Sequence, residues 1–348
     1  MKKKVIIIIL VLFFIIALAV LGAIGYKKYF EKPIVEEPEE IKEEPIVVEK
    51  TVQTFKGNDR PIAVMIDNNT NASPRAGLNK AYMVYEMIVE GGESRLMALF
   101  KGVNLENIGP VRSSRHYFLD YALENDAIYV HFGWSPQAQK DIRTLEIANI
   151  NGIADDDAFW RTNKKQAPHN ALTSTERILK VAETKGYRTT SDVSSVLNYS
   201  VDEVELKNGD AQIAETVKIP YSLSNSVEWK YNNELKVYER YTKGKPELDF
   251  DTEEQVTAKN IIIEFVRNST ISGDSVGRQT LDNLGNIEGY YITNGKAIKI
   301  NCAKTTRRSK TEYTDMNGNQ IKVNDGNTFV QICPIDSKVE IEENETQE

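Results

Sequence analysis

Cysteine and histidine are scarce in this sequence of 348 residues, which contains two cysteines and three histidines. Cys302 and Cys333 are too few to build a disulfide scaffold or a cysteine-rich zinc site, and the sequence leaves open whether they pair with each other. The histidines are His116, His131 and His169, and no two of them have the spacing of a metal-binding helix. The composition therefore predicts a protein without a metal site or another cofactor.

Basic charge is also limited, because 43 lysines and arginines face 51 acidic residues and the net charge is −8. A nucleic-acid-binding protein needs a basic face, so nucleic acid is not an expected partner. The sequence also lacks the G-x-S-x-G, Walker, H-E-x-x-H and S-x-x-K motifs with their companion residues. These absences argue against the standard serine hydrolase, nucleotide-dependent, zinc peptidase and penicillin-binding classes.

One long hydrophobic segment is present, at the N-terminus. The run from Val5 to Gly25 contains 21 uncharged residues, which make about 31 Å of helix and can cross the hydrocarbon core. Three lysines precede it, which favours a cytoplasmic N-terminus with the rest of the chain outside. The alternative is a signal peptide cleaved after Ala17-Leu18-Ala19. No cysteine lies near this segment, so lipid attachment at a lipobox is not expected.

Composition divides the chain further. Residues 31–50 contain eight Glu, three Lys and three Pro, which cannot form a packed core and indicate an extended stalk. The expected organisation is a membrane segment (1–30), an acidic disordered stalk (31–56), a mixed α/β domain (57–195), a connector (196–225), a β-rich domain (226–336) and a disordered acidic tail (337–348).

Strand and helix signals alternate in the first folded region. Pro61–Ile66 predicts a strand, and the runs Met83–Val89 and Ser94–Phe100 predict a hairpin that turns at Gly91-Gly92. Ser135-Pro136 predicts the start of a helix. After residue 221, short β-branched runs alternate with Asn-Gly and Asp-Gly turns. The predicted fold class is α/β, with a mixed sheet and helices in the N-terminal domain, followed by a small all-β C-terminal domain.

Five ordered motifs carry a resemblance to a known family. They are RPIAVMIDNN (60–69), GLNKAYMVYEMIVEGGESR (77–95), IGPVRSSRHYF (108–118), AIYVHFGWSP (127–136) and HNALTST (169–175). Together they resemble the N-terminal domain of the YerB family of bacterial lipoproteins, and VEWKY (227–231) to GNTFVQICP (326–334) resembles its C-terminal domain. The family is a domain of unknown function, so the resemblance implies an architecture and an envelope location but no reaction. The missing lipobox cysteine departs from the family pattern and favours a helical anchor.

The strongest site signal is the segment that follows Gly109-Pro110. Arg112, Ser113, Ser114 and Arg115 are expected to surround the start of a helix that runs to about Glu124, where backbone N–H groups and two guanidinium groups can hold an anion. The competing interpretation is that both arginines form internal ion pairs with acidic residues of the same domain.

Candidate acid–base residues lie in the predicted hairpin and at strand ends. A two-residue turn at Gly91-Gly92 would place Glu86 and Glu90 on one sheet face with Arg95. Asp67 ends the first strand and His131 ends a later one, positions where α/β domains build sites. His169-Asn170 is a weaker candidate for the same site. Each of these residues is also compatible with ordinary packing and cross-strand pairing.

Two functions from different classes follow from these observations. The first is a membrane-anchored extracytoplasmic binding module for an anionic cell-wall component or an envelope protein. The second is a hydrolase or lyase of a cell-wall polymer that uses Asp67, Glu86, Glu90 and His131. A structural scaffold with internally paired arginines is a third possibility. An enzyme requires a carboxylate or histidine within hydrogen-bond reach of the anion site.

The topology can be tested directly. Protease added to intact protoplasts is expected to remove residues 31–348, because the three leading lysines retain the N-terminus inside. Immunoblotting of the protoplasts measures the loss. Protection of the folded part would contradict this topology, and a released mature chain beginning near Val20 would support the signal peptide instead.

Overall fold

The computed structural model describes residues 2–30, 50–207, 209 and 211–343, and the chain divides into two units at Glu49 and Lys50. The first unit contains the helix α1 (Lys2–Phe30), whose 29 residues are long and apolar enough to span a membrane. Most of the predicted stalk, residues 31–49, lies outside the described residues, as does the last part of the predicted tail, residues 344–348. All other elements belong to the second unit.

A large mixed sheet forms the centre of the second unit. Its main strands follow the order β19-β18-β17-β15-β21-β2-β3-β1-β4-β5, and two further strands, β16 and β9, pair with β15 and β18. The strands are β1 (Ile62–Asp67), β2 (Met83–Ile88), β3 (Ser94–Phe100), β4 (Ile128–His131), β5 (Asn149–Asn151), β9 (Gln212–Ile213), β15 (Asn260–Thr270), β16 (Gln279–Asp282), β17 (Gly285–Thr293), β18 (Lys296–Lys304), β19 (Glu312–Asp315) and β21 (Thr328–Pro334).

The parallel pairing of β2 with β21 joins the two halves of the sequence in one sheet. The register runs from Met83 opposite Thr328 to Met87 opposite Ile332. Every residue of both strands is buried, as expected for strands covered on both faces. The regions predicted as an α/β domain and a β-rich domain therefore share a continuous sheet, which local sequence patterns do not indicate because the pairing is between residues far apart in the chain.

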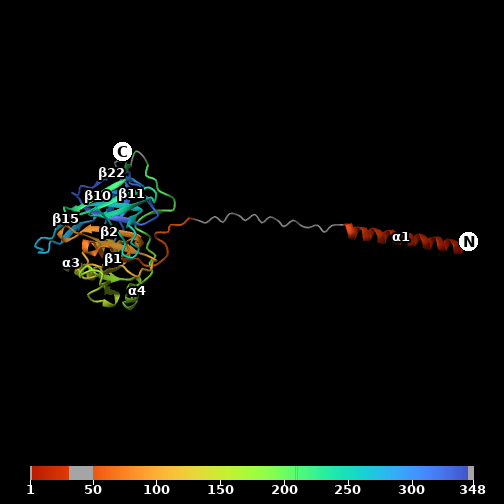
Figure 1. The fold of residues 1–348 in the computed structure, drawn as a ribbon, viewed down its shortest axis with the longest axis horizontal. Coiled ribbons are helices and arrows are strands. Elements are labelled where there is room, and N and C mark those ends of the chain that lie inside the picture. Colours follow the sequence, from red (N-terminus) through yellow and green to blue (C-terminus); the bar gives the residue numbers. More distant parts are fainter. Residues whose placement is uncertain (1, 31–49, 208, 210, 344–348) are drawn as a thin grey trace. The chain divides into compact units, whose positions relative to one another are not determined.

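A second sheet covers one face of the large sheet (Figure 1). The ring of Trp229 on β11 lies 4.8 Å from that of Phe329 on β21, so the two sheets pack directly against each other. The second sheet has the order β13-β12-β11-β10-β22, with β14 beside β12. Its strands are β10 (Thr216–Ser222), β11 (Asn225–Asn232), β12 (Val237–Thr242), β13 (Lys245–Pro246), β14 (Thr257–Ala258) and β22 (Glu340–Glu342).

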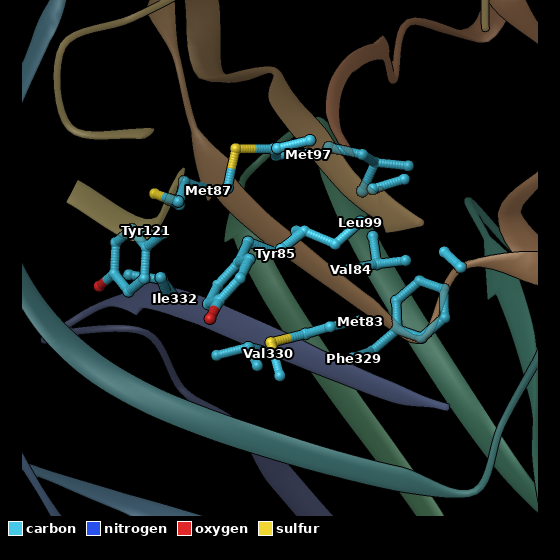
Figure 2. Close-up of a cluster of buried hydrophobic side chains, with 14 of the residues drawn as sticks. Met83, Val84, Tyr85, Met87, Met97, Leu99, Tyr121, Phe329, Val330 and Ile332 are labelled. Carbon is cyan, nitrogen blue, oxygen red and sulfur yellow. The ribbon is translucent and has the colours of Figure 1, made fainter. Parts of the chain in front are cut away.

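Helices occupy the opposite side of β1 and β2, where Figure 1 shows α3 and α4. These helices are α2 (Phe118–Glu124), α3 (Pro136–Thr144) and α4 (Thr175–Thr184). Figure 2 shows Tyr121 of α2 beside Tyr85 of β2, with the ring centroids 4.7 Å apart, above Val330 and Ile332 of β21. Short elements complete the unit: β6 (Phe159–Arg161), β7 (Ala171–Thr173), β8 (Tyr199–Ser200), β20 (Val323–Asn324), and the 3-10 turns η1 (Thr70–Ala72), η2 (Leu78–Lys80), η3 (Glu90–Gly92) and η4 (Asp156–Ala158).

Local capping signals agree well with two of the helices. Ser135 caps α3, with its side chain accepting a hydrogen bond from Ala138 N, and Pro136 occupies the first helical position as predicted. Ser174 caps α4, with its side chain accepting a hydrogen bond from Arg177 N. Gly186 adopts a φ of 68° just beyond the end of this helix, a conformation that glycine accepts without a steric penalty.

The predicted helix start at Ser113 or Ser114 is wrong, because α2 begins at Phe118 and has seven residues. Ser113 Oγ donates to Phe132 O at 2.9 Å, and Ser114 N donates to Gly133 O at 2.9 Å. The segment is therefore held against the loop that follows β4. The helix N-terminus that was expected to receive an anion at this point is not present.

The predicted hairpin register is also wrong, by one residue. Met87, rather than Ile88, lies opposite Arg95, and Glu86 lies opposite Leu96. Five residues connect the strands, and a hydrogen bond from Val89 N to Glu93 O closes this loop. Gly91 and Gly92 take positive φ values of 69° and 72° within it. Since paired residues share a face, Glu86 and Arg95 lie on opposite faces of the sheet.

Parts of the predicted stalk and tail are ordered. The amides of Gln53 and Thr54 donate to the carboxylate of Asp325 at 2.7 and 2.8 Å, so the end of the predicted stalk belongs to the second unit. Glu340–Glu342, predicted as disordered, forms β22 beside β10 because its backbone pairs with the neighbouring strand and Lys218 contacts both glutamates.

The two cysteines are buried and free. Cys302 lies on β18 and Cys333 on β21, and β17 and β15 separate these two strands. Three strand spacings amount to about 14 Å, whereas a disulfide needs Cα atoms within about 7 Å. This fold therefore cannot form the bond that the sequence left open.

A buried chain of alternating charges connects the two sheets. Arg240 of β12 contacts Glu86 of β2 at 2.9 Å and Glu247 at 2.7 Å, and Glu247 contacts Arg75 at 2.6 Å. Burial opposes ionisation of Glu247, but Arg75 and Arg240 lower its pKa to about 2. Ser94 Oγ and Asn68 Nδ2 donate to the remaining oxygen of Glu86, at 2.6 and 2.9 Å. Such a network is stable only while each charge keeps its partners.

We therefore expect Arg240→Met to lower the free energy of unfolding by about 3–5 kcal/mol, because Glu86 and Glu247 lose a partner in a buried environment. Urea denaturation measures this change. Lys218→Met is the matched control, since its ion pairs with Glu340 and Glu342 are exposed, and it is expected to change stability little. Equal effects of the two substitutions would contradict the role of the buried network.

Candidate functional site

The candidate site lies where two parallel strands separate. β1 and β4 pair from Ile62 to Val64, and beyond Val64 the segment Gly109–Ser114 lies between them. Arg112 N donates to Met65 O at 2.9 Å on one side, and Arg112 O accepts from Phe132 N at 3.0 Å on the other. Arg112 is therefore fixed in a crevice at the carboxyl ends of parallel strands, the place where α/β proteins commonly bind ligands.

Asp67 at the end of β1 brings two candidate residues together. Its Oδ2 lies 2.7 Å from His169 Nδ1 and 3.1 Å from Arg112 Nε. Arg112 Nε and the Asp67 carboxylate form an ion pair without hydrogen-bond geometry. Arg112 Nε has no hydrogen-bond partner among the described residues. A carboxylate on Nδ1 fixes the orientation of the His169 ring and leaves Nε2 for a ligand or a proton.

Arg75 holds Asp67 in place through the backbone. Its Nε donates to Asp67 O at 2.8 Å and its Nη2 donates to Asn69 O at 3.1 Å. The same guanidinium contacts Glu247, so the site is connected to the buried charges between the sheets. Lys165 donates to Ala72 O at 2.6 Å, which attaches the loop that carries His169 to the loop after β1. Burial lowers the pKa of Lys165 to about 8.

A cavity of about 370 Å³ opens beside Arg112. Arg161, Ser113 and Trp134 contribute polar and aromatic groups to its lining, and Gly133 and Ile153 come from the loops after β4 and β5. Asn151 connects these two loops, because its Oδ1 accepts from Gly133 N at 2.8 Å and from Ile153 N at 3.3 Å. The cavity is therefore built on the ends of three neighbouring strands.

Arg161 is positioned by two neighbours. Its Nη1 donates to Asn170 Oδ1 at 2.7 Å, and its guanidinium lies 5.0 Å from the centre of the Phe132 ring. Asn170 Nδ2 donates to the carbonyl groups of Thr162 and Lys165 at 3.2 and 3.3 Å, so Asn170 also shapes the loop. Cation–π contact favours this placement of the guanidinium.

His131 is packed away from the cavity. It is fully buried, its Nδ1 donates to Gly133 O at 2.8 Å, and its Nε2 lies 3.3 Å from Asn149 Oδ1. Burial lowers the pKa of His131 to about 4, so its ring is neutral at neutral pH. Its ring lies 5.6 Å from that of Trp134, and it therefore supports a residue that lines the cavity.

Arg115 and Arg95 form internal contacts. Arg115 donates to both oxygens of Glu90 and to Ser114 O, and Arg95 donates to Ser113 O at 2.5 Å. Burial opposes ionisation of Glu90, but the hydrogen bonds and charge of Arg115, together with Arg95, lower the pKa of Glu90 to about 2. Burial lowers the pKa of Arg95 to about 10.

The structure thus groups the predicted residues differently from the sequence. Asp67, Arg112, His169 and Asn170 lie around one site, and Ser113 contributes to its cavity. Glu86 is buried between the sheets, while Arg95, Ser114 and Arg115 form internal contacts and do not line the cavity. The sequence analysis missed Arg75, Asn151 and Arg161, which carry no motif of their own.

Two further observations limit the chemistry. Within residues 2–30, 50–207, 209 and 211–343, no cluster of three or more His, Cys, Asp or Glu side chains has the arrangement of a metal site. A larger cavity of about 1210 Å³ lies beside α4. Its Arg60 and Arg188 share one carboxylate partner, Asp126, at 3.4 and 2.8 Å.

The mixed sheet, its covering sheet and the N-terminal apolar helix define a class of α/β proteins with an apolar N-terminal segment. The chain belongs to the family described as "Protein of unknown function (DUF3048)", whose N-terminal domain matches residues 49–188 and whose C-terminal domain matches residues 217–330. The family resemblance suggested by the sequence motifs is confirmed.

Two relatives support this assignment. The chain is 31% identical over 287 residues to a protein of Bacillus subtilis (strain 168) named "Putative lipoprotein YerB", a match that covers 79% of this chain and 81% of that protein. The crystal structure of YerB from Bacillus subtilis superimposes with a TM-score of 0.72 at 30% identity, covering 81% of this chain and 94% of that one. The predicted fold class is confirmed.

The contribution of the Arg115–Glu90 ion pair to stability can be tested by its pH dependence. Glu90 has a folded-state pKa below its unfolded value, so its contribution to stability is present above about pH 4.5 and is lost as the pH falls toward 2. We expect Arg115→Met to destabilise the protein most above pH 5, with the difference from wild type shrinking between pH 4.5 and 2. Urea denaturation across this range measures it.

Arg112→Met is the control for this experiment, because Arg112 contacts Asp67 rather than Glu90. A difference between Arg115→Met and wild type that stays constant down to pH 2 would show that the Arg115–Glu90 pair does not stabilise the fold.

Proposed function

We propose that this protein is a membrane-anchored, extracytoplasmic binding module of the cell envelope, and that the cavity beside Arg112 binds a small anionic group. The observation that carries the proposal is the presence of two guanidinium groups, those of Arg112 and Arg161, on the lining of one cavity. An envelope partner protein that presents a carboxylate would satisfy the same chemistry.

The apolar helix and the named relative support the location. α1 can span a membrane by length and composition, and the lysines that precede and follow the apolar run are unequal in number, three against two. The larger group favours the cytoplasmic side. The Bacillus subtilis relative is named as a lipoprotein, which fits attachment at the outer face of the membrane. In this chain a single-pass helix would replace the lipid.

The state of the arginine donors supports anion binding. Arg112 is 28% exposed, and its Nη1 and Nη2 have no partner among the described residues. Arg161 uses only Nη1, on a neutral amide oxygen. Guanidinium groups bind carboxylate and phosphate through two parallel hydrogen bonds, and each charge-assisted bond contributes about 1.5–3 kcal/mol. The cavity lining therefore contains guanidinium N–H groups that no described protein oxygen accepts.

The enzymatic alternative has fewer residues left to support it. Glu86 and His131 are engaged in buried contacts, and the partly buried Glu90 is paired with Arg115. The pair Asp67 and His169 is the arrangement that could transfer a proton, because His169 is 17% exposed and Asp67 orients its ring. Binding needs only the arginines, so we favour it as the function.

Arg112→Ala and Arg161→Ala test the proposed binding. Each is expected to weaken the binding of inorganic phosphate and acetate by roughly ten- to a hundredfold, because one charge-assisted contact is lost. Isothermal titration calorimetry of the full chain in detergent measures affinity, and a thermal melt shows whether the fold is retained. Lys218→Ala is the matched control, because the Lys218 side chain on β10 of the second sheet is exposed and is not part of the cavity lining. Unchanged anion affinity in both arginine variants would contradict the proposal.

A further inference from the structure

The cavity beside Arg112 also presents an aromatic ring. Trp134 lines the cavity directly after Gly133, and Ser135 N donates to Ser114 O at 3.1 Å, which fixes this loop. On its other side the indole contacts the buried ring of His131, with the centroids 5.6 Å apart and the planes inclined by 49°. The ring is therefore held by packing and does not need to be ordered when a ligand binds.

The two arginines are held in different ways. Arg112 has backbone hydrogen bonds to both neighbouring strands and an ion pair with Asp67. Arg161 lies against the face of Phe132 and donates to Asn170. Both guanidinium groups are thus positioned by protein contacts before an anion arrives. Preorganised donors of this kind favour a ligand whose acceptors are planar and closely spaced, such as a carboxylate.

Size and lining restrict what else the ligand carries. A volume of about 370 Å³ is near the lower limit of small-molecule sites, which span about 300–1,000 Å³. This volume holds about one ring with its substituents. Ser113 supplies a polar side chain to the lining, while Ile153, 65% exposed, adds apolar surface at the cavity. An aromatic side chain beside polar groups suits a ring with an apolar face and a hydroxylated edge.

We propose that the ligand is a single sugar ring that bears a carboxylate. The carboxylate binds between Arg112 and Arg161, and the apolar C–H face of the ring packs on Trp134. Ser113 is placed to contact a ring hydroxyl. This inference rests on the proposed anion-binding function and adds the chemical class of the ligand.

Affinity measurements with four simple probes test the ligand class. Glucuronate carries both the ring and the carboxylate, glucose carries only the ring, and acetate and inorganic phosphate carry only the charge. Calorimetry of the full chain in detergent is expected to give an affinity for glucuronate at least tenfold above those for glucose, acetate and phosphate. Trp134→Leu is expected to reduce glucuronate affinity about tenfold and to leave acetate affinity unchanged.

Trp160→Leu is the matched control, because Trp160 contacts Arg177 and does not line this cavity. Thermal melts show whether each variant folds. If Trp134→Leu does not fold, Trp134→Phe takes its place: it retains an aromatic ring and is expected to keep both the fold and the affinity for glucuronate.

Three results would overturn the inference, and they can be told apart. If acetate or phosphate binds as tightly as glucuronate and Trp134→Leu has no effect, the sugar class is wrong while anion binding stands. If glucose binds as tightly as glucuronate, the carboxylate is not recognised and both proposals are wrong. If none of the four probes binds, both proposals are also wrong.

Discussion

The structure depends on a buried series of alternating charges, Glu86–Arg240–Glu247–Arg75, which ends on the backbone of Asp67. Removing charges from water is costly, and mutual pairing with good geometry is what makes the arrangement tolerable. The same contacts fasten the second sheet to the large one. They also fix the position of Asp67, and with it the neighbouring Arg112 and His169.

Charged residues around the crevice fall into two groups according to how their hydrogen bonds are used. Arg75, Arg115 and Arg240 have carboxylate partners inside the protein and belong to the fold. Arg112 and Arg161 keep donors that no described residue accepts, and they line the same cavity. A buried neutral histidine, His131, then supports the aromatic part of that cavity.

Local sequence signals predicted what local physics determines. The Ser135-Pro136 helix start and the strand ending at Asp67 follow from capping and hydrophobic pattern. The hairpin register failed by one residue because Gly91 and Gly92 support a longer turn than the two-residue type. Pairings across long sequence distances, such as Arg240 with Glu86 or His169 with Asp67, have no local signature. Such contacts can be inferred only after the parallel pairing of β2 with β21 and the conformation of the loops are known.

The central claim is that the guanidinium groups of Arg112 and Arg161, whose remaining donors have no acceptor among the described residues, form one anion site. Anomalous diffraction from crystals soaked in sodium bromide tests it most directly, because the bromide position is observed rather than inferred from affinity. The account predicts a bromide peak in contact with both Arg112 and Arg161. Bromide bound only elsewhere, with no peak at either guanidinium group, would contradict it.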